Sequence, residues 1–274
     1  METARINELK GIASEVRKDI VRMVGVARSG PLDFPLLLSD LLVYLYWEEM
    51  LLLSASPRRN DRDRFILGTE EGVPALYSVL ARRGFFGREE LWHYRRLGAI
   101  LQALPDYRRT PGIDAPCVTS GTELSLASGI AESLKRGESG ARVFCLMEEK
   151  DCTSADFMVE AQRCADKNIA NMILIVVQKH NALSDRHFPA AEFCGLLSGY
   201  GWKIFETEGS DFESMEKTFN ALSEGPAQPA AVIAGLRNGR GISFVDTDPA
   251  RPKKTLSIEA MDRALEELEG KPNG

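Results

Sequence analysis

Histidine is scarce in this sequence, and its cysteines follow no motif. Only three histidines occur among 274 residues, at positions 93, 180 and 187. The five cysteines are scattered without a C-x-x-C pair, which excludes a regular disulfide framework and is typical of reduced, structural cysteines. Cys152 lies in a loop that other features single out, so a reactive thiol is a second interpretation of that residue.

The sequence also lacks long uncharged apolar runs and an excess of positive charge. The most apolar stretch, residues 34–53, is interrupted by Asp40, Glu48 and Glu49, which excludes a membrane span there. No secretory signal pattern is present, so we expect a cytoplasmic protein. The net charge of -6 argues against nucleic acid and anionic membranes as partners. The local arginine clusters are expected on solvated faces or in subunit contacts.

Apolar periodicity predicts a helical first third followed by alternating strands and helices. Helices are predicted at 6–26, 36–53, 73–82, 88–97, 154–167, 190–200, 212–222 and 257–269. Strands are predicted at 64–67, 143–147, 172–177, 202–206 and 230–234. This order predicts an α/β fold with a doubly wound, mostly parallel sheet flanked by helices. We expect one domain over 1–274, with a helical region at 6–100, a βαβ core at about 110–245 and a C-terminal helix at 257–270.

Several short motifs occur in a fixed order along nearly the whole chain. They are DRFIL at 63–67, PALY at 74–77, RLG at 96–98, LQ at 101–102, TPG at 110–112, the strands at 143–147 and 171–177, GW at 201–202, GSDF at 209–212 and GRGISF at 239–244. In this order and spacing, residues 6 to 270 resemble the N-terminal, diphosphate-binding half of transketolase, as found in separately encoded N-terminal subunits. The resemblance implies the diphosphate-domain type of thiamine diphosphate-binding fold.

The resemblance fails at the metal loop. In that family an aspartate of a Gly-Asp-Gly loop and an asparagine about thirty residues on hold a divalent metal. The resemblance places Glu149 on the aspartate and Lys179 on the asparagine, with Glu148 and Lys150 replacing the glycines. A lysine ammonium has no lone pair, although a glutamate carboxylate suits Mg²⁺. We expect Lys179 or Lys150 to pair with Glu148 or Glu149 and replace the charge of the metal; an ordinary strand-end loop without any ligand is the alternative.

The other cofactor motifs depart from the family pattern as well. The family histidine positions hold Pro31, Glu71 and Leu104, so no catalytic residue is assigned. The resemblance implies a degenerate pocket at Thr69, Glu71, Ser120, Gly121, Glu148, Glu149, Lys150, Asp151, Lys179 and His180. The excess of acids would repel a diphosphate that arrives without its metal. His180 is expected to be a surface or loop histidine.

A partner is expected for a separate reason. In transketolases the C-terminal half of the partner chain holds the aminopyrimidine ring of the cofactor, and these residues do not include that half. Our first hypothesis is a non-catalytic or structural subunit that has lost its thiamine diphosphate and Mg²⁺ site. It would form a homo-oligomer or pair with a C-terminal-half, pyrimidine-domain subunit, and the apolar segment 36–53 suits such a contact. No cofactor is expected in the isolated chain.

Two alternatives stay open. The chain is an essential subunit of a two-component, thiamine diphosphate-dependent transketolase-type transferase, in which a pyrimidine-domain partner completes the site for thiamine diphosphate and Mg²⁺. Alternatively, it is an unrelated metal-assisted enzyme that uses Glu149, Asp151, Glu71 and His180 in an acidic pocket.

Overall fold

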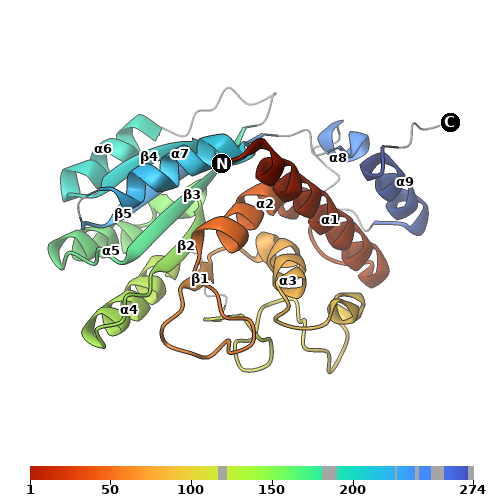
Figure 1. The fold of residues 1–274 in the computed structure, drawn as a ribbon, viewed down its shortest axis with the longest axis horizontal. Coiled ribbons are helices and arrows are strands. Elements are labelled where there is room, and N and C mark those ends of the chain that lie inside the picture. The colour runs from red at the N-terminus through yellow and green to blue at the C-terminus, as the bar shows by residue number, and fades with distance from the viewer. Residues whose placement is uncertain (117–121, 181–189, 226, 238–240, 248–255, 271–274) are drawn as a thin grey trace. The chain divides into compact units, whose positions relative to one another are not determined.

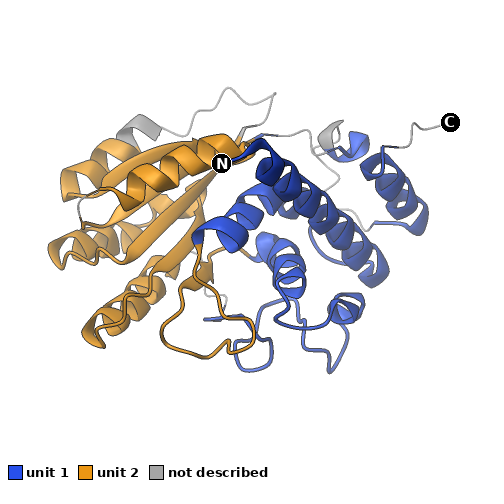
Figure 2. Cartoon of the chain, viewed as in Figure 1, with its two compact units in different colours: residues 1–49, 70–116, 237–274 blue, residues 50–69, 117–236 orange. Residues whose placement is uncertain are grey.

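The structure, a computed structural model, divides the chain into two compact units. It describes residues 1–116, 122–180, 190–225, 227–237, 241–247 and 256–270. Unit 1 comprises residues 1–49, 70–116 and 237–274, and unit 2 comprises residues 50–69 and 117–236 (Figure 2). Unit 1 is helical and unit 2 carries the sheet, so each is described separately. The single-domain organisation expected from the sequence stays a prediction.

Unit 2 is built around one five-stranded sheet. The strands are β1 (Arg64–Leu67), β2 (Val143–Glu148), β3 (Met172–His180), β4 (Lys203–Glu208) and β5 (Ala230–Arg237). Their order is β1-β2-β3-β5-β4, and the pairs β1–β2, β2–β3 and β4–β5 are parallel. Every residue of β2 is buried, as expected of a central strand that is covered on both faces.

The helices of unit 2 follow from the strand order. They are α4 (Glu123–Arg136), α5 (Ala155–Asp166), α6 (Ala190–Tyr200) and α7 (Phe212–Ser223). Connections between parallel strands are right-handed. The helices that connect strands in the direction from β1 to β4 are therefore expected on one face of the sheet, and α7, which connects β4 back to β5, on the other. The helices α4 and α5 pack on each other, as do α5 and α6, and these three helices succeed one another along the sheet in Figure 1. The strand β4 is in contact with both α6 and α7.

Two hydrogen bonds that involve side chains fix the position of α5. Ser154 caps the helix, because its Oγ accepts a 3.2 Å hydrogen bond from the backbone N–H of Phe157. In the middle of the helix, the carbonyl of Ala161 accepts a 2.8 Å hydrogen bond from the indole N–H of Trp202. Trp202 is buried, so its N–H requires a protein acceptor. The start of β4 is thereby held against α5.

The DRFIL motif has a structural role at the start of β1. The carboxylate of Asp63 is buried and accepts hydrogen bonds from the backbone N–H groups of Leu51, at 2.9 Å, and Arg142, at 2.7 Å. The guanidinium of Arg142 adds a 3.0 Å ion pair. This aspartate therefore joins the loop before β1 to the residue before β2, which sets the register of the two strands.

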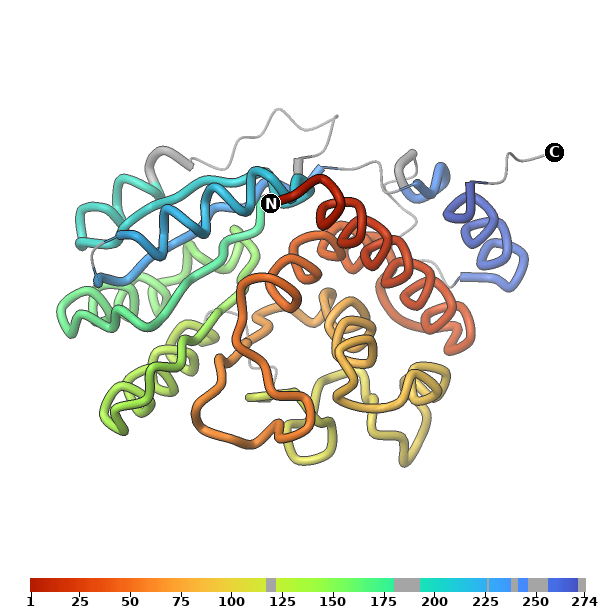
Figure 3. Tube along the Cα trace, in the orientation of Figure 1, coloured from red at the N-terminus to blue at the C-terminus, as the bar shows by residue number. Residues whose placement is uncertain are grey.

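Unit 1 consists of helices packed around the first one. They are α1 (Thr3–Ala27), α2 (Asp33–Tyr44), α3 (Val73–Arg82), α8 (Ser243–Thr247) and α9 (Ile258–Leu268). Figure 3 shows α9, in blue, beside α1, in red. Their contact is close at Gly25, where an added Cβ would lie 2.5 Å from Sδ of Met261. The absence of a side chain at this position lets α9 approach.

A buried carboxylate ties α1 to α3. Asp19 is fully buried and accepts hydrogen bonds from the guanidinium groups of Arg82, at 2.6 Å, and Arg88, at 2.7 Å. Two cations on one carboxylate offset the desolvation that burial imposes on it. Removing either arginine would leave this charge short of a partner inside the unit.

Two predicted helices are shorter than the sequence suggested. The helix expected over 36–53 ends at Tyr44 and continues as one π turn to Glu49. Its residues are buried within unit 1 against α1 and α3, so the apolar character that suggested a partner contact is explained by internal packing. The helix expected over 88–97 is only a 3-10 helix, Arg88–His93, because Arg95 and Gly98 adopt positive φ angles.

The sequence interpretation missed two helices. Leu124, Ala127 and Ala131 face inward from α4 at helical spacing, a signal that was overlooked. The short α8 carries no such signal. The remaining predicted strands and helices are confirmed. Ser257 caps α9, because its Oγ accepts a hydrogen bond from the backbone N–H of Ala260. The predicted fold class, a doubly wound parallel α/β sheet, is confirmed. Among the described helices, none is both long and apolar enough to traverse a lipid bilayer.

Candidate functional site

Three neighbouring strands end at one edge of the sheet in unit 2. Thr69 follows β1, Glu148 is the last residue of β2, and Lys179 is the penultimate residue of β3. Because these strands are adjacent and parallel, their carboxyl ends meet at the same edge. In open α/β sheets this edge is where ligands bind.

The carboxylate of Glu148 is the centre of this edge. Glu148 is 5% exposed, and its two oxygens have different partners. Oε1 accepts a 2.6 Å hydrogen bond from the hydroxyl of Thr69 and lies 3.1 Å from Nζ of Lys150. Oε2 lies 3.2 Å from Nζ of Lys179. The predicted pairing of Lys179 or Lys150 with a glutamate of the loop is confirmed at Glu148, which contacts both lysines.

These partners keep Glu148 ionised although it is buried. Burial alone would raise the pKa of Glu148. The hydrogen bond from Thr69 and the positive charges of Lys179 and Lys150 outweigh burial and hold the pKa below its ordinary value. The edge therefore contains a stable, internally neutralised carboxylate.

The two lysines differ in how firmly they are held. The side chain of Lys179 is 28% exposed, whereas that of Lys150 is 62% exposed. Lys179 belongs to a strand inside the sheet, and Lys150 belongs to the 3-10 turn Glu149–Thr153. Ion pairs in water contribute little, so Lys179 is the stronger partner of the buried carboxylate.

A second buried acid lies close behind the edge. Glu123, the first residue of α4, is 1% exposed. A Cβ added to Gly68 would lie 2.9 Å from Cγ of Glu123 and 2.7 Å from the carbonyl oxygen of Leu146. Only a glycine after β1 allows this approach.

The turn after β2 holds Asp151 and Cys152, both buried. Sγ of Cys152 lies 3.5 Å from the carbonyl oxygen of Glu148. Burial, together with the neighbouring acids, raises the pKa of the Cys152 thiol well above its ordinary value. A thiol held in its protonated form is a poor nucleophile, which supports the structural interpretation of this cysteine.

The other predicted site residues belong to unit 1, to the turn after β2, or to parts of the chain that the structure does not describe. Pro31, Glu71 and Leu104 belong to unit 1. Ser120 and Gly121 lie outside the described residues, as does the side chain of His180. Glu149 is half-buried on the turn after β2. That the predicted residues are remnants of a diphosphate pocket stays a prediction.

The residues of this edge do not fit a divalent metal. The ammonium of Lys179 occupies one side of the Glu148 carboxylate and has no lone pair to offer. A dication about 4 Å from such an ammonium would be repelled by roughly 2 kcal/mol in water and by several times that where water is excluded. Within the described parts of the chain, no three histidine, cysteine, aspartate or glutamate side chains are placed to hold a metal.

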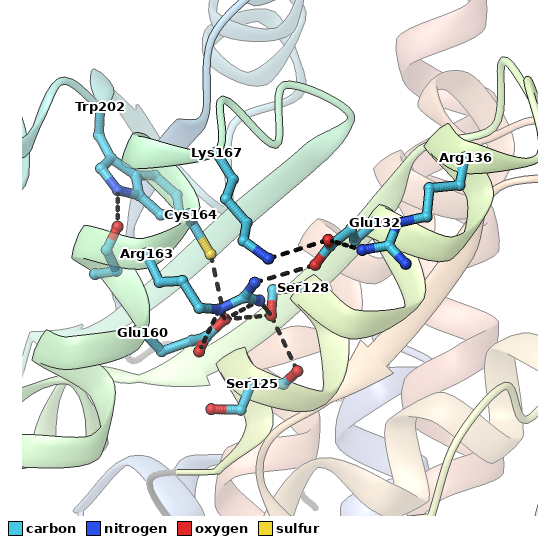
Figure 4. Close-up of polar contacts among 10 residues, drawn as sticks. Ser125, Ser128, Glu132, Arg136, Glu160, Arg163, Cys164, Lys167 and Trp202 are labelled. Atoms are coloured by element: carbon cyan, nitrogen blue, oxygen red, sulfur yellow. Dashed lines mark hydrogen bonds and ion pairs between the residues drawn. The ribbon is translucent and has the colours of Figure 1, made fainter.

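A second polar cluster, which the sequence interpretation missed, joins α4 to α5 (Figure 4). Glu160 is buried, accepts a hydrogen bond from the hydroxyl of Ser128, and pairs with Arg163 through two 2.9 Å contacts from Nε. Arg163 also reaches Glu132 at 3.0 Å. Burial and the charge of Glu160 raise the pKa of the adjacent Cys164 thiol to about 12. Each of these side chains has a partner within the cluster, so the cluster joins the two helices. Its only signal in the sequence was the spacing of Glu160 and Arg163, which lie three positions apart on one helix.

Unit 2 is a parallel α/β sheet with a buried, charged side chain at the edge where its strands end. The protein therefore belongs to the class of open α/β folds, which bind ligands at that edge. A family model described as the thiamine diphosphate-binding domain of transketolase matches residues 9–151. The match spans more than half of the 274 residues, so the chain belongs to this family.

The similar proteins include separate subunits and longer chains. An apulose-4-phosphate transketolase subunit of Phocaeicola vulgatus is 23% identical over 268 residues, which cover 94% of this chain and 95% of that protein. A 6-deoxy-6-sulfo-D-fructose transketolase subunit of a Clostridium species is 23% identical, with 96% of each chain covered. Human transketolase is 24% identical, but only 42% of its length is covered.

The solved structures show the same fold. The transketolase of Campylobacter jejuni superposes with a TM-score of 0.84 at 20% identity. The match covers 100% of this chain and 44% of that one. The chain therefore spans somewhat less than half of a one-chain transketolase.

Proposed function

We propose that this chain is the N-terminal-half subunit of a two-component transketolase-type transferase, which acts only with a chain that supplies the C-terminal half. The observation that carries the proposal is the end-to-end match with a protein named as one subunit of a transketolase, of which 95% is covered. The same residues cover only 44% of a one-chain transketolase. A two-component assembly explains why the chain matches nearly all of a separate subunit but less than half of a one-chain transketolase.

In such an assembly this chain would shape the ligand edge rather than supply the metal site. Thr69, Glu148 and Lys179 lie at the sheet edge where open α/β folds bind ligands. Their side chains already satisfy one another, so they are not offered to a metal. Thiamine diphosphate and its metal would depend on groups that a pyrimidine-domain partner brings.

A second candidate is a non-catalytic subunit that stabilises or regulates a transketolase-like complex. The ion pairs of Glu148 with Lys150 and Lys179 favour it, because they close the edge with internal charges. This candidate also requires a partner, which is either a C-terminal-half subunit or a second copy. The two candidates differ in whether the complex transfers a ketol group.

Reconstitution separates the two. The chain would be purified alone and mixed with a separately encoded C-terminal-half subunit, and ketol transfer would be followed with thiamine diphosphate, Mg²⁺ and a panel of ketose donors. The panel follows the names of the relatives: apulose 4-phosphate, 6-deoxy-6-sulfo-D-fructose and fructose 6-phosphate.

The outcomes are distinct. Transfer that requires both proteins supports the two-component transferase. A stable complex without transfer for any donor supports the non-catalytic subunit. Failure to form any complex, as seen by light scattering of the mixture, would contradict both candidates.

A further inference from the structure

We propose that the ammonium of Lys179 is the resident cation of this sheet edge: it replaces a divalent metal at Glu148, so the chain neither needs nor accepts a metal there. The proposal has a positive counterpart. Replacing Lys179 by asparagine, which offers an amide oxygen, should open a divalent cation site that the natural chain keeps closed.

The first step is that both oxygens of the buried Glu148 carboxylate are in contact with donors. Glu148 is 5% exposed. Oε1 has the hydroxyl of Thr69 at 2.6 Å and Oε2 has Nζ of Lys179 at 3.2 Å. A metal that took Oε2 of Glu148 as a ligand would lie beside the ammonium of Lys179, which has a charge of the same sign.

The second step is the rigidity of Lys179. It lies in β3, whose residue Val177 is paired in register with Glu148 itself. Its backbone position is therefore fixed by the sheet and cannot move away as a loop residue can. Its side chain is 28% exposed, so little water competes for the carboxylate. Lys150, on the neighbouring turn and 62% exposed, lacks both properties.

The third step is what remains when the ammonium is removed. Glu148 is the buried carboxylate of this edge, and position 179 lies on the adjacent strand β3. Hard cations such as Mg²⁺ and Mn²⁺ take carboxylate and amide oxygens as ligands. An asparagine at 179 would remove one positive charge and add one such oxygen at the same strand position. The edge would then carry the Glu148 carboxylate and an amide oxygen on two adjacent strands.

This inference goes beyond the proposed function, because it concerns the isolated chain and holds for either kind of subunit. It also makes a statement about folding: no divalent ion contributes to the stability of this edge. Both statements are measured without a partner and without any turnover. A failure here would therefore not be confused with a failure of the two-component proposal.

The experiment measures Mn²⁺ binding to the full chain by electron paramagnetic resonance. Three proteins are compared: the natural chain, Lys179→Asn and Lys167→Asn. Lys167 is the matched control, because it belongs to the same unit and forms an ion pair of the same length, 3.2 Å, with Glu132. Both variants remove one positive charge and one ion pair. Only Lys179→Asn changes the sheet edge.

We expect Lys179→Asn to bind one Mn²⁺ at least about tenfold more tightly than the natural chain. Lys167→Asn should match the natural chain. Equal Mn²⁺ affinity in the two variants would overturn the proposal, as would one-site binding by the natural chain that Glu148→Gln abolishes.

A second measurement guards against loss of folding. The melting temperature of the natural chain is recorded in Mg²⁺ and in EDTA, because a ligand that binds only the folded state raises it. The proposal requires no difference between the two conditions. A rise in Mg²⁺ that disappears in Glu148→Gln would overturn it, whether or not Lys179→Asn folds.

Discussion

The hydroxyl of Thr69 donates a 2.6 Å hydrogen bond to Oε1 of Glu148, although 79 positions separate the two residues in the sequence. The bond joins the ends of two parallel strands. Lys179, near the end of a third strand, pairs with the other oxygen of Glu148. A polar side chain at one strand end thus depends on the ends of its neighbours. Single substitutions at this edge should therefore lower the free energy of unfolding by different amounts, depending on which partner of Glu148 is removed.

Lys179→Met should destabilise the protein more than Lys150→Met does. Both changes remove an ammonium from the same carboxylate, but Lys179 is 28% exposed and Lys150 is 62% exposed. Leaving a buried carboxylate short of a charged partner costs about 1–3 kcal/mol, whereas an exposed ion pair contributes about 0–1 kcal/mol. Urea unfolding gives both free energies. Equal losses would show that Lys179 is no firmer a partner than Lys150.

The ionisation of Glu160 should make the free energy of unfolding depend on pH in the acid range. Burial acts to raise its pKa, but hydrogen bonds from Arg163 and Ser128 outweigh burial and hold the pKa below its ordinary value of 4.5. The unfolded chain therefore binds this proton first as pH falls. Stability from this group is complete above about pH 4.5 and is lost as pH falls through the lower, folded-state pKa.

The measurement is the free energy of unfolding as a function of pH. Glu160→Gln should flatten the acid limb of that curve. Asp166→Asn is the matched control, since it removes an exposed carboxyl from the end of the same helix. An acid limb that is unchanged in Glu160→Gln would contradict the account of this cluster.

Gly25→Ala should loosen α9 from α1. The new Cβ would lie 2.5 Å from Sδ and 2.7 Å from Cγ of Met261. Overpacking of this kind costs about 1–3 kcal/mol, which exceeds the roughly 1 kcal/mol that alanine gains over glycine within a helix. Thermal unfolding measures the loss. The double variant with Met261→Ala should recover most of it, and a double variant as unstable as Gly25→Ala would refute the close contact as the cause.

Native cysteines should differ sharply in reactivity. Cys152 and Cys164 are buried, and burial raises the pKa of each thiol. Cys194 is only partly buried. Iodoacetamide at pH 8 should therefore modify Cys194 first and leave the other two intact until the protein is denatured. Peptide mass spectrometry gives the rates, and modification of Cys152 as fast as Cys194 would restore its interpretation as a reactive thiol.

The sheet could be predicted because its signals are local. The β-branched run at 172–177 and the alternation of strands with helices gave five strands and the fold class. The ends of the helices were less predictable. Nothing in the apolar pattern of 36–53 reveals that Leu51 must leave the helix to donate its N–H to Asp63, at 2.9 Å.

The candidate site was predictable in kind but not in detail. Charge and lone-pair chemistry gave an ion pair in place of a metal. The burial of Glu148 against Thr69 depends on which residue ends β2, and that is set by strand register. The cluster around Glu160 was missed because its partners, Ser128 and Glu132, belong to a helix that the sequence interpretation did not recognise.

Calorimetric titration of the isolated natural chain with thiamine diphosphate and Mg²⁺ tests the central claim most directly. Because Lys179 and Thr69 already satisfy Glu148, the account predicts no saturable heat at ligand concentrations up to about 1 mM. One-to-one binding with a Kd of about 1–10 μM that requires Mg²⁺ would contradict it.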